Sequence, residues 1–237
     1  MDILSSLAIV TLAGLVHASF QLSVSVLTLL SGHTIGAKRS HAKLLRLTSS
    51  FVFGAGLMTV LLLSFMSLLL VNVFGNHTPR LIWAAACGLM VGVAIAIWAF
   101  YYRHEKGTTL WIPRGMANYL TKRTKSTKLS GEAFGLGLSS VIGEILFIIA
   151  PLIISALVLI QLPAFWQLVG IGIYALVSML SIITVWILIG SGHTLSHIQK
   201  WRETNKHFIQ FTAGAGLIVL GFFVYVYQVI GSGVGVS

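Results

Sequence analysis

The chain has 237 residues, of which 57% are hydrophobic and only 8% are charged. A soluble domain carries about 25% charged residues, so this composition indicates a membrane protein that crosses the bilayer several times. The net charge of +10 does not indicate a nucleic-acid-binding protein, because the basic residues cluster between apolar segments. A single cysteine, Cys87, excludes an intrachain disulfide, a CxxC redox pair and a zinc site built from thiolates.

Six apolar segments are long enough to cross a bilayer as helices, which requires about 20 residues. We therefore predict an all-α integral membrane protein with six transmembrane helices. Their approximate ranges are 4–30, 50–74, 81–101, 134–160, 165–189 and 208–230.

The basic residues predict the orientation of these helices. All lysines and arginines except Arg80 lie in the loops after the first, third and fifth segments. The positive-inside rule places these loops in the cytoplasm and both termini outside. We expect a multi-pass protein of the cell (inner) membrane, surrounded by the lipid bilayer. Within the third loop, residues 111–123 are compatible with a short interfacial helix and equally with a solvated linker.

A polar pattern occurs twice, in the first and fourth segments. Gly14, His17 and Gln21 match Gly137, Ser140 and Glu144 at a constant offset, and 88–91 matches 216–219 at a similar one. Because each copy would hold three helices, the second must enter the membrane inverted relative to the first. We predict two inverted three-helix repeats, residues 1–106 and 133–237, joined by a basic cytoplasmic linker, residues 107–132. The pairing of the second segment with the fifth is not visible in the sequence.

This pattern resembles the lysine-exporter (LysE) superfamily. Most of the likeness lies in FGLGLSSVIGEILFIIAPLIISAL and AGAGLIVLGFFVYVY, in the fourth and sixth segments. The nearest patterns are those of the CcdA/DsbD membrane domains and the NicO-type nickel/cobalt carriers, and the resemblance implies a six-helix carrier. The chain lacks the cysteines of the former group and, beside His17, the acidic partner of the latter. Thiol electron transfer is therefore not supported, and the resemblance names no substrate.

Glu144 is the only acidic residue within the six segments. A carboxylate near the bilayer centre costs about 2.5–3.5 kcal/mol, so we expect it to face protein or a water-filled cavity. The single acid favours a cationic solute or a proton over an anion. We predict a substrate- or ion-binding site between the first and fourth helices, formed by His17, Gln21, Ser140, Glu144 and Pro151. The same groups are also compatible with structural hydrogen bonds between the two halves, and Pro151 is expected to kink its helix rather than break it.

His193 and His197 lie one helical turn apart at the inner end of the fifth segment. This spacing is compatible with a transition metal, but no third ligand is identifiable. Histidine at the C-terminal end of a helix is favourable without a metal, which is the interpretation we prefer. No cofactor is expected.

We predict a small-solute transporter, an exporter or carrier coupled to a cation or a proton. The alternative is a non-transporting membrane accessory or assembly factor with a structural polar stripe. An enzyme is not expected, because no nucleophile–base pair, phosphate loop or paired carboxylate occurs. The small-residue faces of the helices permit a homodimer.

Overall fold

The computed structural model describes residues 2–20, 22–36, 41–75, 77–100, 114–191 and 195–231, and within these ranges it contains helices and short connections without any strand. The helices are α1 (Ile3–Ala18), α2 (Leu22–Gly36), α3 (His41–Phe74), α4 (Arg80–Phe100), α5 (Arg114–Ser126), α6 (Ser130–Gly143), α7 (Ile145–Leu159), α8 (Ala164–Ser178), α9 (Leu180–Gly190), α10 (Leu195–Thr204), α11 (Lys206–Tyr225) and the π-helical continuation η1 (Val226–Ile230).

The longest helices have the dimensions and the surface of membrane spans. α3, α4 and α11 with η1 are long and apolar enough to cross a bilayer, and up to six spans result if each bent pair of helices counts as one. Large apolar side chains are exposed on the outside of the bundle, among them Phe53, Phe65, Phe208 and Phe222. An apolar surface of this extent suits contact with lipid chains. The helices thus indicate a membrane protein, as the composition predicted.

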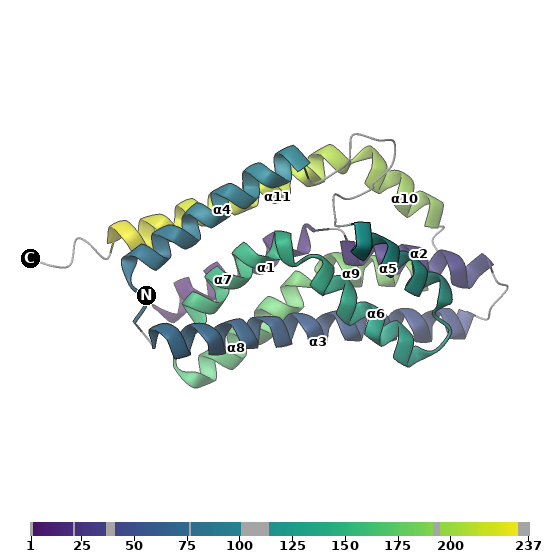
Figure 1. Ribbon diagram of the computed structural model, residues 1–237, viewed down its shortest axis with the longest axis horizontal. Helices are drawn as coiled ribbons and strands as arrows, with labels where there is room; N and C mark the ends of the chain where they lie inside the picture. Colours follow the sequence, from purple (N-terminus) through teal and green to yellow (C-terminus); the bar gives the residue numbers. More distant parts are fainter. Residues whose placement is uncertain are drawn as a thin grey trace, which may run out of the picture.

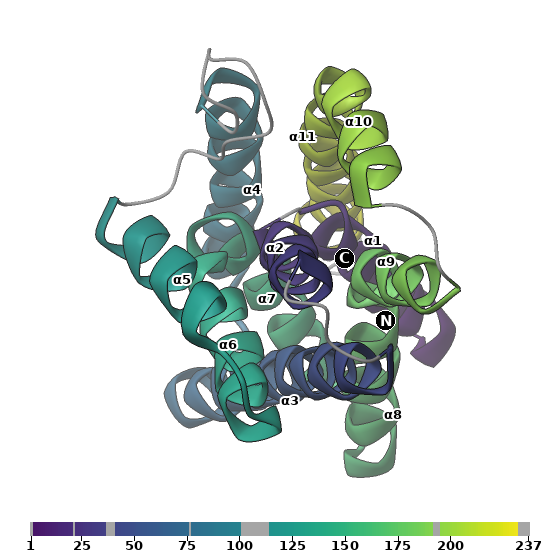
Figure 2. The same ribbon diagram turned by 90° about the vertical axis from the view of Figure 1, so that its right-hand side faces the viewer.

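The helices pack around a central apolar element. α4 and α11 lie side by side along one edge, α3 lies along the opposite edge, and α1 and α7 lie between them (Figure 1). Viewed from the end that carries α5 and α10, the pair α4–α11 projects from one side of the bundle (Figure 2). α7 contacts α1, α3, α4 and α8 and is buried over most of its length. A helix that is apolar all round, as α7 is, belongs in such a core.

Three of the predicted segments are bent pairs of helices. The bend is 79° between α6 and α7, 49° between α8 and α9, and 46° between α1 and α2. In the first pair the break is at Glu144, and α7 runs as one helix through Pro151. The sharp bend therefore does not lie at Pro151, where the sequence suggested a kink. The α6–α7 break coincides with the close approach of α2, since a Cβ on Gly143 would lie 2.8 Å from Leu22 Cδ2.

The basic linker is partly helical, because α5 occupies most of its described residues. α6 then begins at Ser130, and the carboxylate of Glu132 accepts the backbone N–H groups of Lys128 at 2.7 Å and Leu129 at 3.1 Å. These two hydrogen bonds stabilise the ionised form, so the pKa of Glu132 is lowered. The carboxylate thus holds the chain that enters α6.

The two glycines paired in the sequence make matching contacts. A Cβ on Gly137 of α6 would overlap the carbonyl oxygen of Phe51 in α3. A Cβ on Gly14 of α1 would lie 3.3 Å from the carbonyl oxygen of Tyr174 and 3.1 Å from Val177 Cβ in α8. Phe51 and Tyr174 are separated by the same offset as Gly14 and Gly137. Both close approaches therefore occur at positions separated by the same offset, one pair in the first and fourth segments and the other in the second and fifth.

We predict that Gly137→Ala lowers the melting temperature of the purified protein in detergent. The added Cβ forces α6 away from α3, and overpacking of this kind costs about 1–3 kcal/mol. Gly135→Ala on the same helix is the matched control, because a Cβ there meets nothing within 4 Å. Alanine should make that control neutral or slightly more stable, by roughly 0.5–1 kcal/mol. Equal melting temperatures for the two variants would contradict the close approach.

Candidate functional site

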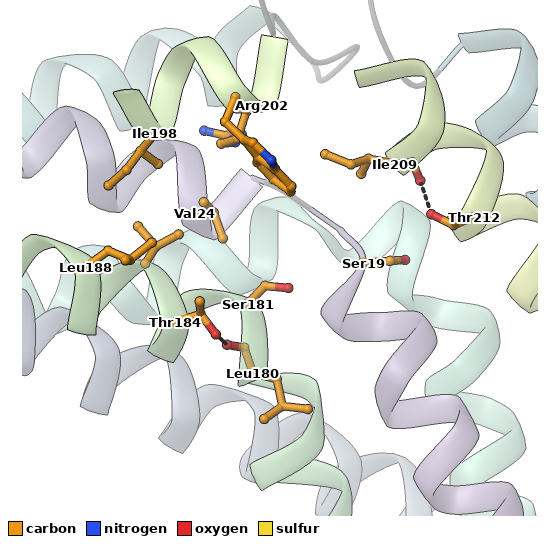
Figure 3. Close-up of a pocket in the computed structure, with 12 residues that line it drawn as sticks. Ser19, Val24, Leu180, Ser181, Thr184, Leu188, Ile198, Arg202, Ile209 and Thr212 are labelled. Carbon is orange, nitrogen blue, oxygen red and sulfur yellow. Dashed lines mark hydrogen bonds between the residues drawn. The ribbon is translucent and has the colours of Figure 1, made fainter. Parts of the chain in front are cut away.

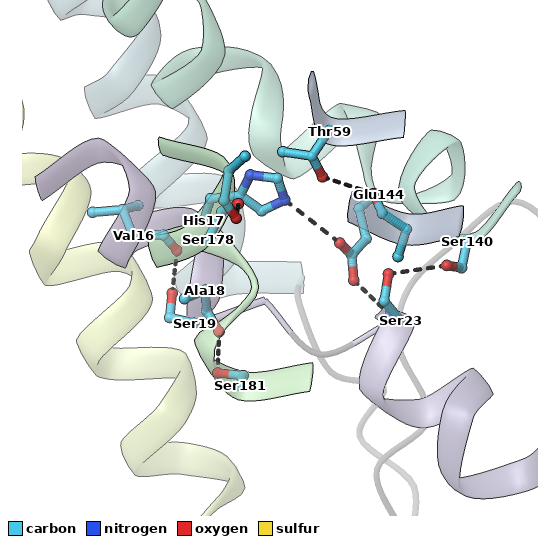
Figure 4. Close-up of polar contacts among 12 residues, drawn as sticks. Val16, His17, Ala18, Ser19, Ser23, Thr59, Ser140, Glu144, Ser178 and Ser181 are labelled. Atoms are coloured by element: carbon cyan, nitrogen blue, oxygen red, sulfur yellow. Dashed lines mark hydrogen bonds and ion pairs between the residues drawn. The ribbon is translucent and has the colours of Figure 1, made fainter. Parts of the chain in front are cut away.

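Glu144 connects the two breaks. Its side chain is buried, and its Oε1 accepts the backbone N–H of Ser23 at 2.7 Å. Ser23 lies in the first turn of α2, where N–H groups lack partners within the helix and the helix dipole favours a negative charge. The carboxylate at the α6–α7 break thus caps the helix that begins after the α1–α2 break (Figure 4).

Two serines extend this junction. The hydroxyl of Ser23 donates to Ser140 Oγ at 3.1 Å, and Ser140 donates to the carbonyl oxygen of Gly137 at 2.8 Å. Ser140 is buried in α6. These bonds tie the N-terminus of α2 to α6, so two of the predicted site residues, Ser140 and Glu144, meet at the same helix end.

His17 lies beside this junction, in the last turn of α1. Its Nδ1 is 3.0 Å from the hydroxyl of Tyr174 in α8, and its Nε2 is 3.9 Å from Glu144 Oε2. The second distance is longer than a hydrogen bond, so the imidazole and the carboxylate face each other across a gap. The imidazole has the Tyr174 hydroxyl beside one nitrogen and the Glu144 carboxylate facing the other, so it is placed to pass a proton from one group toward the other. All three side chains are buried.

A small cavity adjoins these groups. It measures about 20 Å³ and is lined by residues that include His17, Glu144, Thr59, Ser178 and Ser181. This volume has room for one water molecule or a small ion. The hydroxyl of Ser181 donates to the carbonyl oxygen of Ala18 at 2.5 Å, which ties the end of α1 to α9. The predicted histidine and glutamate thus border a space that a single small particle fills.

A second, larger cavity of about 580 Å³ lies between α2, α9, α10 and α11 (Figure 3). Its wall consists of Ser19, Val24, Leu180, Ser181, Thr184, Val185, Leu188, Ile198, Trp201, Arg202, Ile209 and Thr212. Val24 and Ser181 also line the small cavity. The larger cavity therefore extends from α10 to the break after α1 and ends beside the His17–Glu144 pair. Its volume is typical of small-molecule sites.

Two residues of this region were missed in the sequence. Arg202 is buried in the wall of the larger cavity, and its Nη2 donates to Ser25 Oγ at 2.7 Å. The sequence assigned it only to a basic cytoplasmic loop. Tyr174 lies in the fifth apolar segment and was not predicted as a site residue, although it is separated from Phe51 by the same offset as Gly14 from Gly137. That correspondence is the one signal that would have drawn attention to Tyr174.

The remaining predicted residues do not join the cluster in the described part of the chain. Pro151 is buried within α7, and neither cavity wall includes it. Gln21 and His193 lie outside the described residues, and His197 falls in α10 without a described side chain. Among the residues that the structure does describe, no group of three or more His, Cys, Asp or Glu is placed to hold a metal ion.

No protein-family model, curated protein or solved structure matches this chain. The features that bear on its function are therefore the helix breaks and the two cavities.

We predict that Glu144→Ala destabilises the protein more than Glu144→Gln does. Alanine leaves the N–H of Ser23 without its acceptor, which costs about 1–3 kcal/mol in a buried site. Glutamine keeps an oxygen that accepts this hydrogen bond and removes only the charge. Melting temperatures in detergent measure both effects.

The matched control is Glu203→Ala, which removes an exposed acidic side chain from α10. If Glu144→Ala melted at the same temperature as this control, Glu144 would not be an important helix cap.

Proposed function

We propose that the protein is a small-solute membrane transporter with six spans, built as two inverted three-helix repeats. The observation that carries this proposal is the 580 Å³ cavity, which ends at the α1–α2 break beside buried His17 and Glu144. Transporters of this kind bind solutes where discontinuous helices meet, because the helix ends offer polar groups within an apolar protein.

The packing supports the repeat. The most extensive interfaces join α3 with α6, α1 with α8, and α4 with α11. In the proposed repeat, α1–α2 corresponds to α6–α7, α3 to α8–α9, and α4 to α11. The α3–α6 interface then corresponds to the α1–α8 interface, and the α4–α11 interface corresponds to itself. The glycine contacts at Gly137 and Gly14 obey the same exchange. The resemblance to the lysine-exporter superfamily implies the same inverted three-helix repeat.

The distribution of basic residues supports the orientation. The start of α3 and helices α5 and α10, which carry most of the described lysines and arginines, lie at one end of the molecule, whereas Arg80 begins α4 at the other (Figure 1). The positive-inside rule assigns the first end to the cytoplasm and both termini to the outside of the cell membrane. On this assignment the larger cavity lies on the cytoplasmic side, and the protein is in an inward-facing state.

Glu144 gives a physical basis for proton coupling. Its negative charge holds the N-terminus of α2 through the Ser23 N–H and the helix dipole. Protonation removes that charge and weakens the junction between α2 and the α6–α7 break. His17, with Tyr174 on its other nitrogen, is the neighbouring group that exchanges a proton with it. A proton would thus change the contact that separates the two halves of the molecule.

The second candidate is the non-transporting accessory or assembly factor. The capping of α2 favours it, because a carboxylate with this structural task needs no solute to explain its burial. The two candidates differ in one respect. Only a transporter must open the region of the helix breaks to each side of the membrane in turn.

We predict that single cysteines will detect such alternation in a Cys87→Ala background. Thr184→Cys lies in the wall of the larger cavity and should react with a membrane-impermeant maleimide from the cytoplasmic side. Ser155→Cys lies in α7 at a position that is fully buried here. It should react from the outside only when the protein opens outward, and lowering the external pH should increase that fraction. The measurement is the labelled fraction in vesicles of known orientation at pH 5.5 and pH 8, which lie about 1.5 units below and 1 unit above neutral. At each pH it is compared with the same cysteine in the Glu144→Gln background.

Glu144→Gln in the Ser155→Cys background is the control. It removes the titrating carboxylate but keeps the pH dependence of the thiolate–maleimide reaction itself, so it should lack the extra labelling at low pH. If Ser155→Cys stayed protected under every condition while Thr184→Cys reacted, the accessory-factor interpretation would replace the transporter.

A further inference from the structure

The burial of Arg202 needs an explanation beyond membrane orientation. Within the described residues, Arg202 is the one lysine or arginine whose side chain is buried, at 4% exposed. Lys200, two residues earlier on the same helix, is exposed and satisfies the positive-inside rule equally well. Arg202 Nη2 donates to Ser25 Oγ at 2.7 Å, which offsets part of the cost of burying a guanidinium. The buried guanidinium places a positive charge in the wall of the 580 Å³ cavity, and this charge bears on the kind of ligand that the cavity takes.

The rest of the cavity wall indicates what that ligand is. The described wall contains no aspartate or glutamate, so Arg202 sets its charge. The wall also holds four hydroxyl groups, and each of them donates to a backbone carbonyl oxygen: Ser19, Ser181, Thr184 and Thr212. Arg202 is therefore the group that offers charged donors to a ligand. The remaining lining residues are apolar, among them Leu188, Ile198 and Trp201. Ligand sites commonly combine a mainly apolar wall with a few polar groups that fix orientation.

We propose that the 580 Å³ cavity binds an amphipathic organic anion with a single oxyanion head group. The guanidinium of Arg202 receives the head group, since its planar N–H groups match the geometry of a carboxylate or sulfonate. The apolar part of the anion lies against Val24, Leu188 and Ile198. Arg202 lies at the α10 side of the cavity, and Ser19 and Ser181 lie away from it, on the side of the break after α1 (Figure 3).

This inference rests on the proposed transport function and gives its solute a chemical class. It also changes the expectation from the sequence, in which the single acid in the membrane favoured a cation. Glu144 borders the small cavity rather than the larger one. The group that a solute meets in the larger cavity is therefore Arg202, and the acid beyond it remains available for the proton.

The test uses three probes of equal chain length: hexanoate, hexanamide and hexylammonium. Binding to the purified full chain is followed by tryptophan fluorescence, because Trp201 lines the cavity. We expect saturable binding of hexanoate, and little change with the neutral or the cationic probe. Trp201→Phe should remove the signal and so locate it in this cavity. Equal responses to all three probes, or a preference for hexylammonium, would overturn the proposal.

The variants separate charge from fold. Arg202→Gln should weaken hexanoate binding by about tenfold or more, as expected when a charge-assisted hydrogen bond is lost. Arg202→Lys should retain part of the affinity, and Lys200→Gln, the exposed neighbour, should leave it unchanged. Ile198→Trp fills the cavity while Arg202 stays in place, so it should also block hexanoate binding. It provides a second test in case Arg202→Gln fails to fold. Unaltered affinity in Arg202→Gln or Ile198→Trp would assign the anion to another place.

The cysteine assay distinguishes this inference from the transport proposal. Hexanoate should protect Thr184→Cys from the maleimide, since both occupy the same cavity. If Ser155→Cys reports outward opening but hexanoate neither binds nor protects, the protein is a transporter of another solute and the anion inference fails. If hexanoate protects Thr184→Cys but Ser155→Cys never reacts, the anion site stands and transport fails.

Discussion

The bond between Glu144 and the N-terminus of α2 is the contact on which the centre of this structure depends. Inside a bilayer each backbone N–H needs a partner within the protein, because no water is present to supply one. A helix that begins in the middle of a span therefore carries unsatisfied N–H groups, and the carboxylate of Glu144 meets that need at Ser23. Since this carboxylate lies at the break between α6 and α7, one side chain joins the two discontinuities.

A structural and a functional role for Glu144 are not exclusive alternatives. The contact has a charged part, the carboxylate on the helix end, and a neutral part, the Ser23–Ser140–Gly137 chain of hydrogen bonds. Protonation removes the charge and leaves the neutral part in place. The junction would then be weakened without being lost, which is what a reversible rearrangement requires. His17 Nε2 lies 3.9 Å from Glu144 Oε2, which is beyond a direct hydrogen bond, so a proton would pass between them through a water molecule or after a small side-chain movement.

The sequence predicted the parts of this arrangement that depend on periodicity. The six apolar segments correspond to α1–α2, α3, α4, α6–α7, α8–α9 and α11. Ser140 and Glu144, which the sequence placed in one site, both hydrogen-bond to Ser23. The break at Glu144 was not predicted, because nothing in Gly143-Glu144 differs from an ordinary helical pair until α2 packs against it. Arg202 was missed for a similar reason. Its burial results from α10 folding back over α2, and a count of charges in loops carries no information about that contact.

The positions of the two charges give the proposed transport cycle a direction. An anion bound as proposed in the larger cavity would be held by Arg202 on α10, away from the helix breaks. To pass the breaks it must move toward Glu144, and a like charge in an apolar surrounding opposes that step. Protonation of Glu144 removes the repulsion and at the same time loosens its hold on α2. One proton would therefore lower both barriers, the electrostatic one for the anion and the mechanical one for the helices, so that anion and proton cross the membrane in the same direction.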